Sequence, residues 1–203
     1  WPFAYRSLLT EMRTNLYKEN QAMTTEENAE CYIDLFDMML VVNSPHNSYT
    51  KMVPLFPLIY SDRCIYSGYT YIPWRITDGS LNFMSMRSLL WGSQLGWVEP
   101  SLLMRPDAKR EAKFLKNLTD FRRQQHDLFL GRFIQEIIPT GDNPTQEIPN
   151  YEITPVVLAA EWASVSGEHV YLIVNMSEQE HKVILPNKKQ ITVKALDAIR
   201  ISK

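Results

Sequence analysis

The pattern of apolar residues changes once along this chain, close to Leu128, and the change limits the folds available to it. Before it, long segments with apolar residues at helical spacing alternate with short extended segments. After Gly131 the chain consists of short strand-like runs such as "RFIQEII", "HVYLIVNMS" and "QITVKAL", separated by turns such as "PTGDNP" and "PNKK". We therefore predict two domains, an α/β domain over residues 1–128 and a small antiparallel β-sandwich over residues 129–203.

The first domain is predicted to contain parallel βα units. Helical spacing predicts helices over Phe3–Lys18, "AECYIDLFDMMLVV", "LNFMSMRSLLWGSQLGW" and Ala108–Leu128, the third of them broken at Gly92 and Gly96. The segments "NQAMTT" and "MVPLFPLIYSDRCIYSGYTYI" favour extended structure. Two such strands cannot form a stable closed sheet, because parallel strands need further neighbours and cover on both faces. The chain also begins at Trp1, already inside an amphipathic segment. We therefore expect the first domain to be a piece of a longer protein.

Composition and charge exclude several classes of function. The net charge is -2, so no excess of positive charge attracts nucleic acid or anionic lipid. No apolar run reaches the length that spans a membrane, and no glycine-rich phosphate loop follows a strand. The four histidines form no pair at metal-ligand spacing, and Cys31 and Cys64 are each expected to be buried free thiols. We predict no metal and no cofactor.

Carboxylates gather where the first strand gives way to the next segment. Glu26, Glu27 and Glu30 fall within seven residues after "NQAMTT", and Asp62 follows the extended segment "PLFPLIYS". Carboxyl ends of parallel strands meet at one edge of a sheet, so we expect Glu26 and Asp62 to lie at that edge. The alternative is that the glutamates occupy the first turn of a helix, where they interact favourably with its dipole, and that Asp62 caps a turn.

Several segments in order resemble a known family. "TTEENAECYIDLFD", "PLFPLIYSDRCIYSG", "LLWGSQLGW", "DLFLGRFIQEI" and "VVLAAEWASVSGEHVYLIVNMSEQEHKVILP" are together similar to the C-terminal half of a (β/α)8-barrel glycoside-hydrolase-like family with an appended β-sandwich, common among carbohydrate-degrading gut bacteria. The resemblance implies that residues 1–128 are the last βα units of a barrel whose N-terminal half is missing. It also implies an oligosaccharide or polysaccharide substrate and a periplasmic or secreted location.

The resemblance and the residue pattern point to the same candidate site. Most glycosidases use two carboxyl groups that face the scissile bond. Glu26 is the first candidate, Glu30 and Asp62 are the others within this chain, and the true partner of Glu26 can also lie on an upstream strand.

Aromatic side chains can stack on the apolar faces of sugar rings. The substrate-binding candidates are Tyr60, Tyr66, Trp91, Gln94 and Trp97, each of which can equally be a core residue, whereas Trp162 is expected to pack in the core of the sandwich.

Two functions therefore stay open. The first is a glycoside hydrolase that uses paired carboxylates, with this chain alone expected to be inactive. The second is a non-catalytic carbohydrate-binding or structural module, which the absence of a convincing second carboxylate favours. Neither the sugar nor the stereochemical outcome follows from the sequence, because the latter depends on the distance between the two carboxyl groups.

Overall fold

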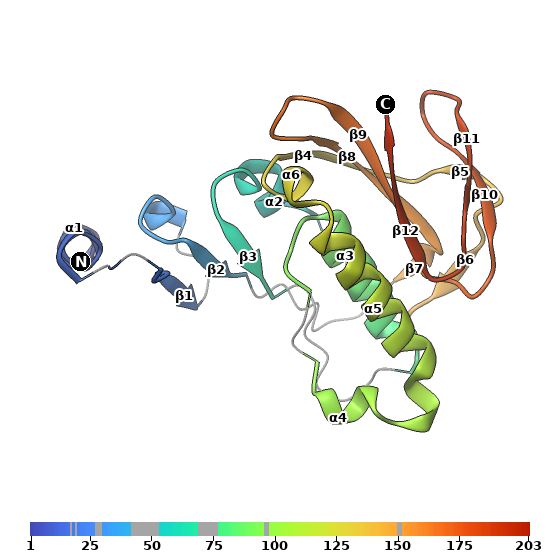
Figure 1. Cartoon of the computed structure of the whole chain (residues 1–203), viewed down its shortest axis with the longest axis horizontal. Helices are drawn as coiled ribbons and strands as arrows, with labels where there is room; N and C mark the ends of the chain where they lie inside the picture. Colours follow the sequence, from blue (N-terminus) through green and yellow to red (C-terminus); the bar gives the residue numbers. More distant parts are fainter. Residues whose placement is uncertain are drawn as a thin grey trace.

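The computed structural model describes residues 1–16, 18, 20–26, 30–41, 53–68, 77–95, 98–149 and 152–203 (Figure 1). Short parallel strands lie toward the N-terminus, helices occupy the middle, and antiparallel sheets form the C-terminal part. The helices are α1 (Pro2–Glu11), α2 (Leu55–Tyr60), α3 (Ser80–Leu90), α4 (Pro100–Leu103), α5 (Lys109–Arg123) and α6 (His126–Phe129). The strands are β1 (Thr24–Glu26), β2 (Met38–Leu40), β3 (Ile65–Ser67), β4 (Arg132–Ile137), β5 (Thr140–Gly141), β6 (Thr145–Glu147), β7 (Ile153–Pro155), β8 (Val157–Ala163), β9 (His169–Asn175), β10 (His181–Ile184), β11 (Gln190–Val193) and β12 (Asp197–Ser202).

The parallel sheet predicted for the N-terminal part is present, but its strands differ from those expected. β1 ends the predicted strand "NQAMTT", and β2 and β3 add to it in the order β1-β2-β3. The helix predicted over "AECYIDLFDMMLVV" is wrong, because this segment holds a 3-10 turn (Glu30–Tyr32) followed by β2. The middle residue of β2, Met39, is fully buried between its neighbours on β1 and β3. Pairing on both sides of β2 therefore outweighs the helical spacing.

The strand predicted over "PLFPLIYS" is also wrong, because Leu55–Tyr60 forms helix α2. Pro54 is the N-cap of α2 and Pro57 lies within its first turn. The first turn of a helix has backbone N–H groups without intrahelical partners, so a proline there costs no hydrogen bond. The strand that follows, β3, begins only at Ile65. Phe56 of α2 packs against Tyr66 of β3, with ring centroids 5.3 Å apart.

The three parallel strands have one covered face and one open face. Their register aligns Thr25, Met39 and Tyr66 in one row on the face that α2 covers. The opposite face carries two rows of side chains, since alternate residues of a strand point to opposite faces. These rows are Thr24, Met38 and Ile65 near the amino ends of the strands, and Glu26, Leu40 and Ser67 at the carboxyl ends. Parallel sheets normally have both faces covered, so the open face is unusual.

Helix α3 lies at the centre of the molecule. All eleven of its residues are buried, and it packs against α5 and against strands β8 and β9. Trp162 of β8 donates a hydrogen bond from its indole nitrogen to the carbonyl oxygen of Leu90, at 2.9 Å. Trp162 is fully buried, as predicted, and packs edge-on against Phe129 and Phe133. The last turn of α3 is therefore bound directly to the antiparallel part of the chain.

The antiparallel strands predicted after Gly131 are present, and the described residues beyond that point contain no helix. One sheet has the order β12-β9-β8-β4 and another has the order β11-β10-β5, with β6 and β7 as a separate pair. Helix α5 packs against β12, and Figure 1 shows α3 and α5 beside the four-stranded sheet. Helices from the first predicted domain thus cover a sheet of the second, and the boundary at residue 128 stays a prediction. No helix among the described residues is long and apolar enough to cross a membrane.

Gly92 is expected to be essential for the contact between α3 and Trp162. Its φ is +79°, and a Cβ atom there would lie 2.5 Å from a ring carbon of Trp162 and 2.9 Å from the hydroxyl of Tyr66. We predict that Gly92→Ala lowers the free energy of unfolding by about 3 kcal/mol, because left-handed backbone strain and overpacking add together. Chemical denaturation of this chain measures the effect.

Gly167 provides the matched control for this substitution. Its φ is +84°, but a Cβ atom would meet nothing within 4 Å. Gly167→Ala should therefore cost only the backbone strain, about 1 kcal/mol. Equal losses in the two variants would show that the contact with Trp162 contributes nothing.

Candidate functional site

A groove of ≈ 650 Å³ lies along the open face of the parallel sheet. The carboxyl-end row of the sheet supplies Glu26, Leu40 and Ser67, and the segment after α3 supplies Gln94 and Leu95. The remaining lining residues are Thr24, Thr25, Met38 and Gly68. At Gly68 a Cβ atom would lie 2.6 Å from the carbonyl oxygen of Val41, so only glycine permits this close approach of the two chain segments. The groove therefore combines one carboxylate with hydroxyl, amide and apolar groups.

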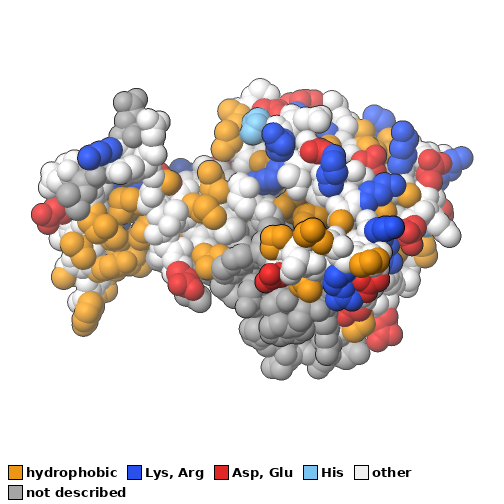
Figure 2. All heavy atoms as spheres, turned by 60° about the horizontal axis from the view of Figure 1, so that its bottom comes forward, with side chains coloured by type: hydrophobic (Ala, Val, Ile, Leu, Met, Phe, Trp, Pro, Cys, Tyr) orange, Lys and Arg blue, Asp and Glu red, His pale blue; other side chains and the backbone are white. Residues whose placement is uncertain are grey.

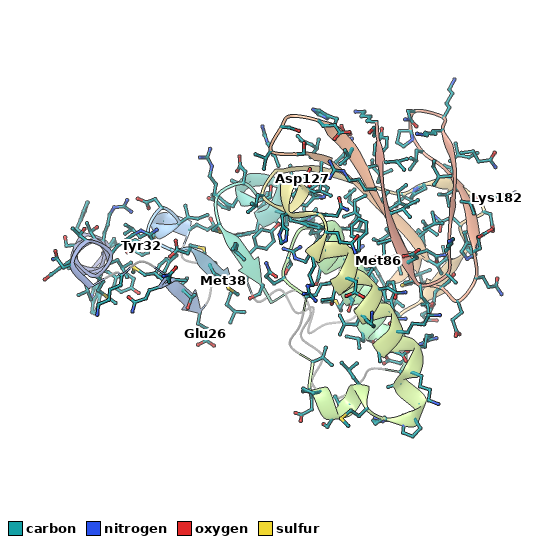
Figure 3. All side chains as sticks on the ribbon, in the orientation of Figure 1. Glu26, Tyr32, Met38, Met86, Asp127 and Lys182 are labelled. Atoms are coloured by element: carbon teal, nitrogen blue, oxygen red, sulfur yellow. The ribbon has the colours of Figure 1, made fainter. Side chains whose placement is uncertain are left out.

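Glu26 is the predicted catalytic residue that lies in this groove. It is the last residue of β1 and is exposed. Figure 3 shows it at the carboxyl end of β1, directed away from the strand toward solvent. Among the described residues that line the groove, it is the one acidic residue. The sequence prediction that Glu26 ends a parallel strand is confirmed, while its catalytic role stays a prediction.

Gln94, a substrate-binding candidate from the sequence, also lines this groove. Its backbone N–H donates to the carbonyl oxygen of Tyr66 at 2.8 Å, which holds the segment after α3 against β3. The Gln94 side chain is half-buried and lines the groove. An amide side chain can both donate and accept hydrogen bonds, so Gln94 can contact a polar ligand beside Glu26.

Glu30 and Tyr60 lie together, but they do not line the groove. The Tyr60 hydroxyl donates to a carboxylate oxygen of Glu30 at 3.5 Å, which joins the 3-10 turn to α2. Desolvation and the nearby charge of Glu30 raise the pKa of Tyr60. Tyr32, in the same turn as Glu30, packs edge-on against Tyr5 of α1 at 5.1 Å, and Figure 3 shows this turn beside α1. The structure thus places Glu30 beside α2, in a turn that also lies next to α1, and not in the groove.

Asp62 does not follow a strand, so its predicted position at the carboxyl edge is wrong. It lies in the turn between α2 and β3, and therefore at the amino end of β3. Its carboxylate is 3.4 Å from the Arg63 guanidinium, and both side chains are exposed. Because the three strands run parallel, the length of the sheet separates Asp62 from Glu26.

Trp91 is a core residue, so the prediction that it binds substrate is contradicted. Its side chain is 0% exposed, and its indole nitrogen donates to a carboxylate oxygen of Glu136 at 2.7 Å. Arg87 stacks on the Trp91 ring at 5.3 Å and forms an ion pair with Glu152 at 2.7 Å. Tyr66 is likewise buried, with its hydroxyl hydrogen-bonded to the carbonyl oxygen of Trp91. Trp97 and Glu27 lie outside the described residues.

The sequence analysis missed Ser67 and Thr24 as groove residues. Ser67 shares a face with Glu26 because the strand register aligns Glu26 with Leu40 and Leu40 with Ser67. Thr24 shares that face because it lies two residues before Glu26 on the same strand. Alternation within "TTE" and "IYS" is the signal that could have found them. Three-residue strands carry too little alternation to fix a face without the structure.

A second polar cluster is centred on the turn between β9 and the start of β10, strands that belong to different antiparallel sheets. The Nδ1 atom of His181 is 3.1 Å from an Asp142 carboxylate oxygen, and its Nε2 atom is 2.9 Å from the Ser177 hydroxyl. The order matches a Ser-His-Asp triad, but the Ser177 hydroxyl also faces Asn175 Oδ1 at 2.9 Å and the Gln179 carbonyl at 3.0 Å. These acceptors compete for its one proton, so the cluster stabilises the turn and does not present an activated nucleophile.

The two cysteines differ in their surroundings. Cys31 is exposed, so the expectation that it is buried is wrong, and Cys64 is half-buried. Burial raises the pKa of the Cys64 thiol to about 11, so it stays protonated at neutral pH. No group of three or more His, Cys, Asp or Glu residues able to hold a metal occurs in the part of the chain that the structure describes.

Comparison with known proteins finds a family model and a named relative to which this chain is similar. Residues 1–71 match the family model described as "Domain of unknown function (DUF6259)". The chain is 98% identical over 204 aligned residues to a Bacteroides thetaiotaomicron protein named "Putative glycoside hydrolase". The alignment covers all of this chain and 30% of that relative. The chain thus spans about 30% of the length of the curated relative it matches.

Substitutions at Trp91 and Gln94 test these two assignments in the full-length protein. Trp91→Phe should lower the free energy of unfolding by about 2 kcal/mol, because it leaves the Glu136 carboxylate without its donor, and should leave saccharide affinity unchanged. Gln94→Ala should weaken saccharide binding about fivefold, the loss of about one hydrogen bond, with little effect on unfolding. Calorimetric titration and thermal unfolding of both variants measure these effects. If Trp91→Phe weakened saccharide binding without affecting unfolding, Trp91 would have to be assigned to the binding site.

Proposed function

We propose that this chain is part of a glycoside hydrolase in which β1, β2 and β3 form one sector of a (β/α)8 barrel and Glu26 is one of the two reacting carboxyl groups. The observation that carries the proposal is the position of Glu26. It ends a parallel strand and lines a groove on the open face of the sheet. In barrel enzymes the active site lies at the carboxyl ends of the strands, where this groove begins. The name of the Bacteroides relative agrees with this chemistry.

The open face of the sheet supports the barrel proposal. In a barrel, strands that are adjacent in sequence pair in parallel, and one face of each strand points to the interior. The order β1-β2-β3, the helix α2 on one face and the uncovered rows on the other all fit one sector of such a barrel. Ile65, in the row near the amino ends of the strands, is 44% exposed in this chain. The interior of a complete barrel would bury it.

Apolar residues on the outside of the N-terminal part give further support. Trp1, Phe3 and Leu8 of the α1 region are exposed, as are Leu58 and Ile59 of α2. Figure 2 shows hydrophobic side chains gathered over the N-terminal part of the chain, at the left of the view. Contiguous exposed apolar surface usually marks an interface with other protein. In the proposed enzyme, the rest of the polypeptide covers this surface.

The proposed chemistry assigns each group a role. One carboxylic acid protonates the oxygen of the leaving sugar, while a carboxylate attacks the anomeric carbon or activates water. Glu26 supplies one of these functions, and its partner comes from a strand in the remaining part of the protein. Gln94 and Ser67 can hydrogen-bond sugar hydroxyls, because both line the groove beside Glu26. The periplasmic or secreted location that the resemblance implies is part of this proposal.

A non-catalytic saccharide-binding module is the second candidate function. It is favoured by one observation, which is that the described residues of the groove include a single carboxylate. In that case the full-length protein would bind a glycan in a saturable way and release no products.

The decisive experiment replaces Glu26 in the full-length protein. A panel of oligosaccharides and polysaccharides identifies a hydrolysed substrate through release of reducing ends. We expect Glu26→Gln to lower kcat about 100-fold or more, because a general acid or base contributes at least that much. The variant should unfold at the same temperature as the unmodified protein, since Glu26 is exposed.

Glu30→Gln and Asp62→Asn provide matched controls that remove a carboxylate elsewhere. Glu30 bonds to Tyr60, and Asp62 lies at the amino end of β3, so both variants should keep kcat within a few-fold. Activity of Glu26→Gln within a few-fold of the unmodified protein would exclude Glu26 from the reaction. Saturable binding without products would favour the non-catalytic function.

A further inference from the structure

A second hollow lies beside the edge of β3 that faces away from β2. It has a volume of ≈ 260 Å³ and is enclosed by β3, the segment after α3, and helices α5 and α6. Figure 1 shows the C-terminal end of α5 and α6 next to β3. β3 is the last strand in the order β1-β2-β3, so this hollow adjoins a sheet edge. Gln94 and Leu95 line both this hollow and the groove of Glu26, and therefore separate the two.

Arg122 of α5 brings a poorly solvated positive charge to this hollow. Its Nη2 donates to the carbonyl oxygen of Gly92 at 3.0 Å, and its guanidinium stacks on the Phe129 ring at 4.3 Å. Its Nη1 is shielded from solvent and has no hydrogen-bond partner among the described residues. Burial lowers the pKa of Arg122 to about 10, so the guanidinium remains charged at neutral pH. The Arg122 side chain is half-buried. A charge that is partly withdrawn from water without a counter-charge is costly, and in folded proteins such charges are normally paired.

The other residues of the hollow increase its positive character. Arg123 and His126 also line it, and no aspartate or glutamate does so in the described part of the chain. Thr119 and Gln94 add groups that can donate hydrogen bonds. This environment suits an anionic group such as a carboxylate or a phosphate, since both match a guanidinium in shape and charge.

We propose that a carboxylate side chain from the remaining part of the full-length polypeptide enters this hollow and pairs with the guanidinium of Arg122. This inference rests on the proposed barrel, which places further polypeptide beside the edge of β3. The curated relative contains that polypeptide, since this chain spans 30% of its length.

Apolar residues in the hollow favour a polypeptide segment over a free anion. Ile65 is 44% exposed and Leu130 is 62% exposed, and both line the hollow. A small anion would neutralise Arg122 and leave these side chains in water. A chain segment that carries a carboxylate would neutralise the charge and also bury the apolar surface, which adds a hydrophobic contribution.

The test compares two substitutions at Arg122 in the full-length protein. Arg122→Lys and Arg122→Gln both shorten the side chain and keep an N–H donor, but only lysine keeps the charge. If a carboxylate occupies the hollow, the lysine variant should unfold at least about 2 °C above the glutamine variant. If none does, the glutamine variant should be equal or more stable, because it removes an unpaired charge. Arg123→Gln, at the exposed neighbour in the same hollow, should change the midpoint by less than about 1 °C.

Buffer composition distinguishes the source of the negative charge. The measurements are first made with chloride as the only anion and then repeated with added inorganic phosphate. A higher unfolding temperature of the lysine variant in chloride supports a carboxylate of the polypeptide. If the lysine variant is the more stable only with phosphate, the hollow binds a free anion and the proposal is overturned. Unfolding is measured without saccharide, so its outcome is independent of the hydrolysis assay with Glu26→Gln. If Glu26-dependent hydrolysis is found but the lysine variant unfolds no higher than the glutamine variant, the ion pair is rejected and the proposed enzyme function is kept.

Discussion

The contact between the end of α3 and Trp162 is the interaction on which the rest of the structure depends. The Trp162 indole binds the carbonyl of Leu90, and Gly92 allows the ring to lie directly against the backbone. From this point the chain continues to Gln94, whose N–H holds β3 through the carbonyl of Tyr66. These contacts help to connect the antiparallel sheet to the parallel sheet, as does the N–H of Phe133 on β4, which donates to the Ser61 hydroxyl after α2 at 2.8 Å. A shift at the contact between α3 and Trp162 would also move Gln94 and change the groove that contains Glu26.

The sequence predicted those elements whose pattern is long enough to outweigh local ambiguity. The helices α3 and α5 and the strands β8 and β9 have sustained periodicity or a continuous apolar run, and all four were predicted, although α3 ends at Leu90 and α5 at Arg123, before the predicted ends. The segments that became β2 and α2 were predicted wrongly, because each is short and tertiary contacts decide its conformation. Met39 is buried by strands on both sides, and the prolines of α2 occur at its start, where they are tolerated.

The sequence was enough to identify Glu26 as a candidate carboxylate, but not to identify the residues that surround it. Glu26 could be identified because a strand end is a chemical position that the sequence reveals. The face to which a side chain points depends on strand register, which the sequence of a three-residue strand does not contain. Trp91 was misassigned for a related reason. Its context, with a glycine beside it, resembles a binding segment, yet the glycine serves the contact with Trp162 and the tryptophan binds Glu136.

The two hollows on either side of Gln94 have opposite chemistry, as the two separate roles proposed for them require. The groove on the open face contains the carboxylate of Glu26 and no cation among its described lining residues. The hollow at the edge of β3 contains two arginines and no carboxylate among its described lining residues. If Arg122 faced the groove, its charge would pair with Glu26 and favour the ionised form of that carboxyl group. The segment Gln94–Leu95 lies between them, so Arg122 lines only the hollow at the edge of β3 and Glu26 only the groove.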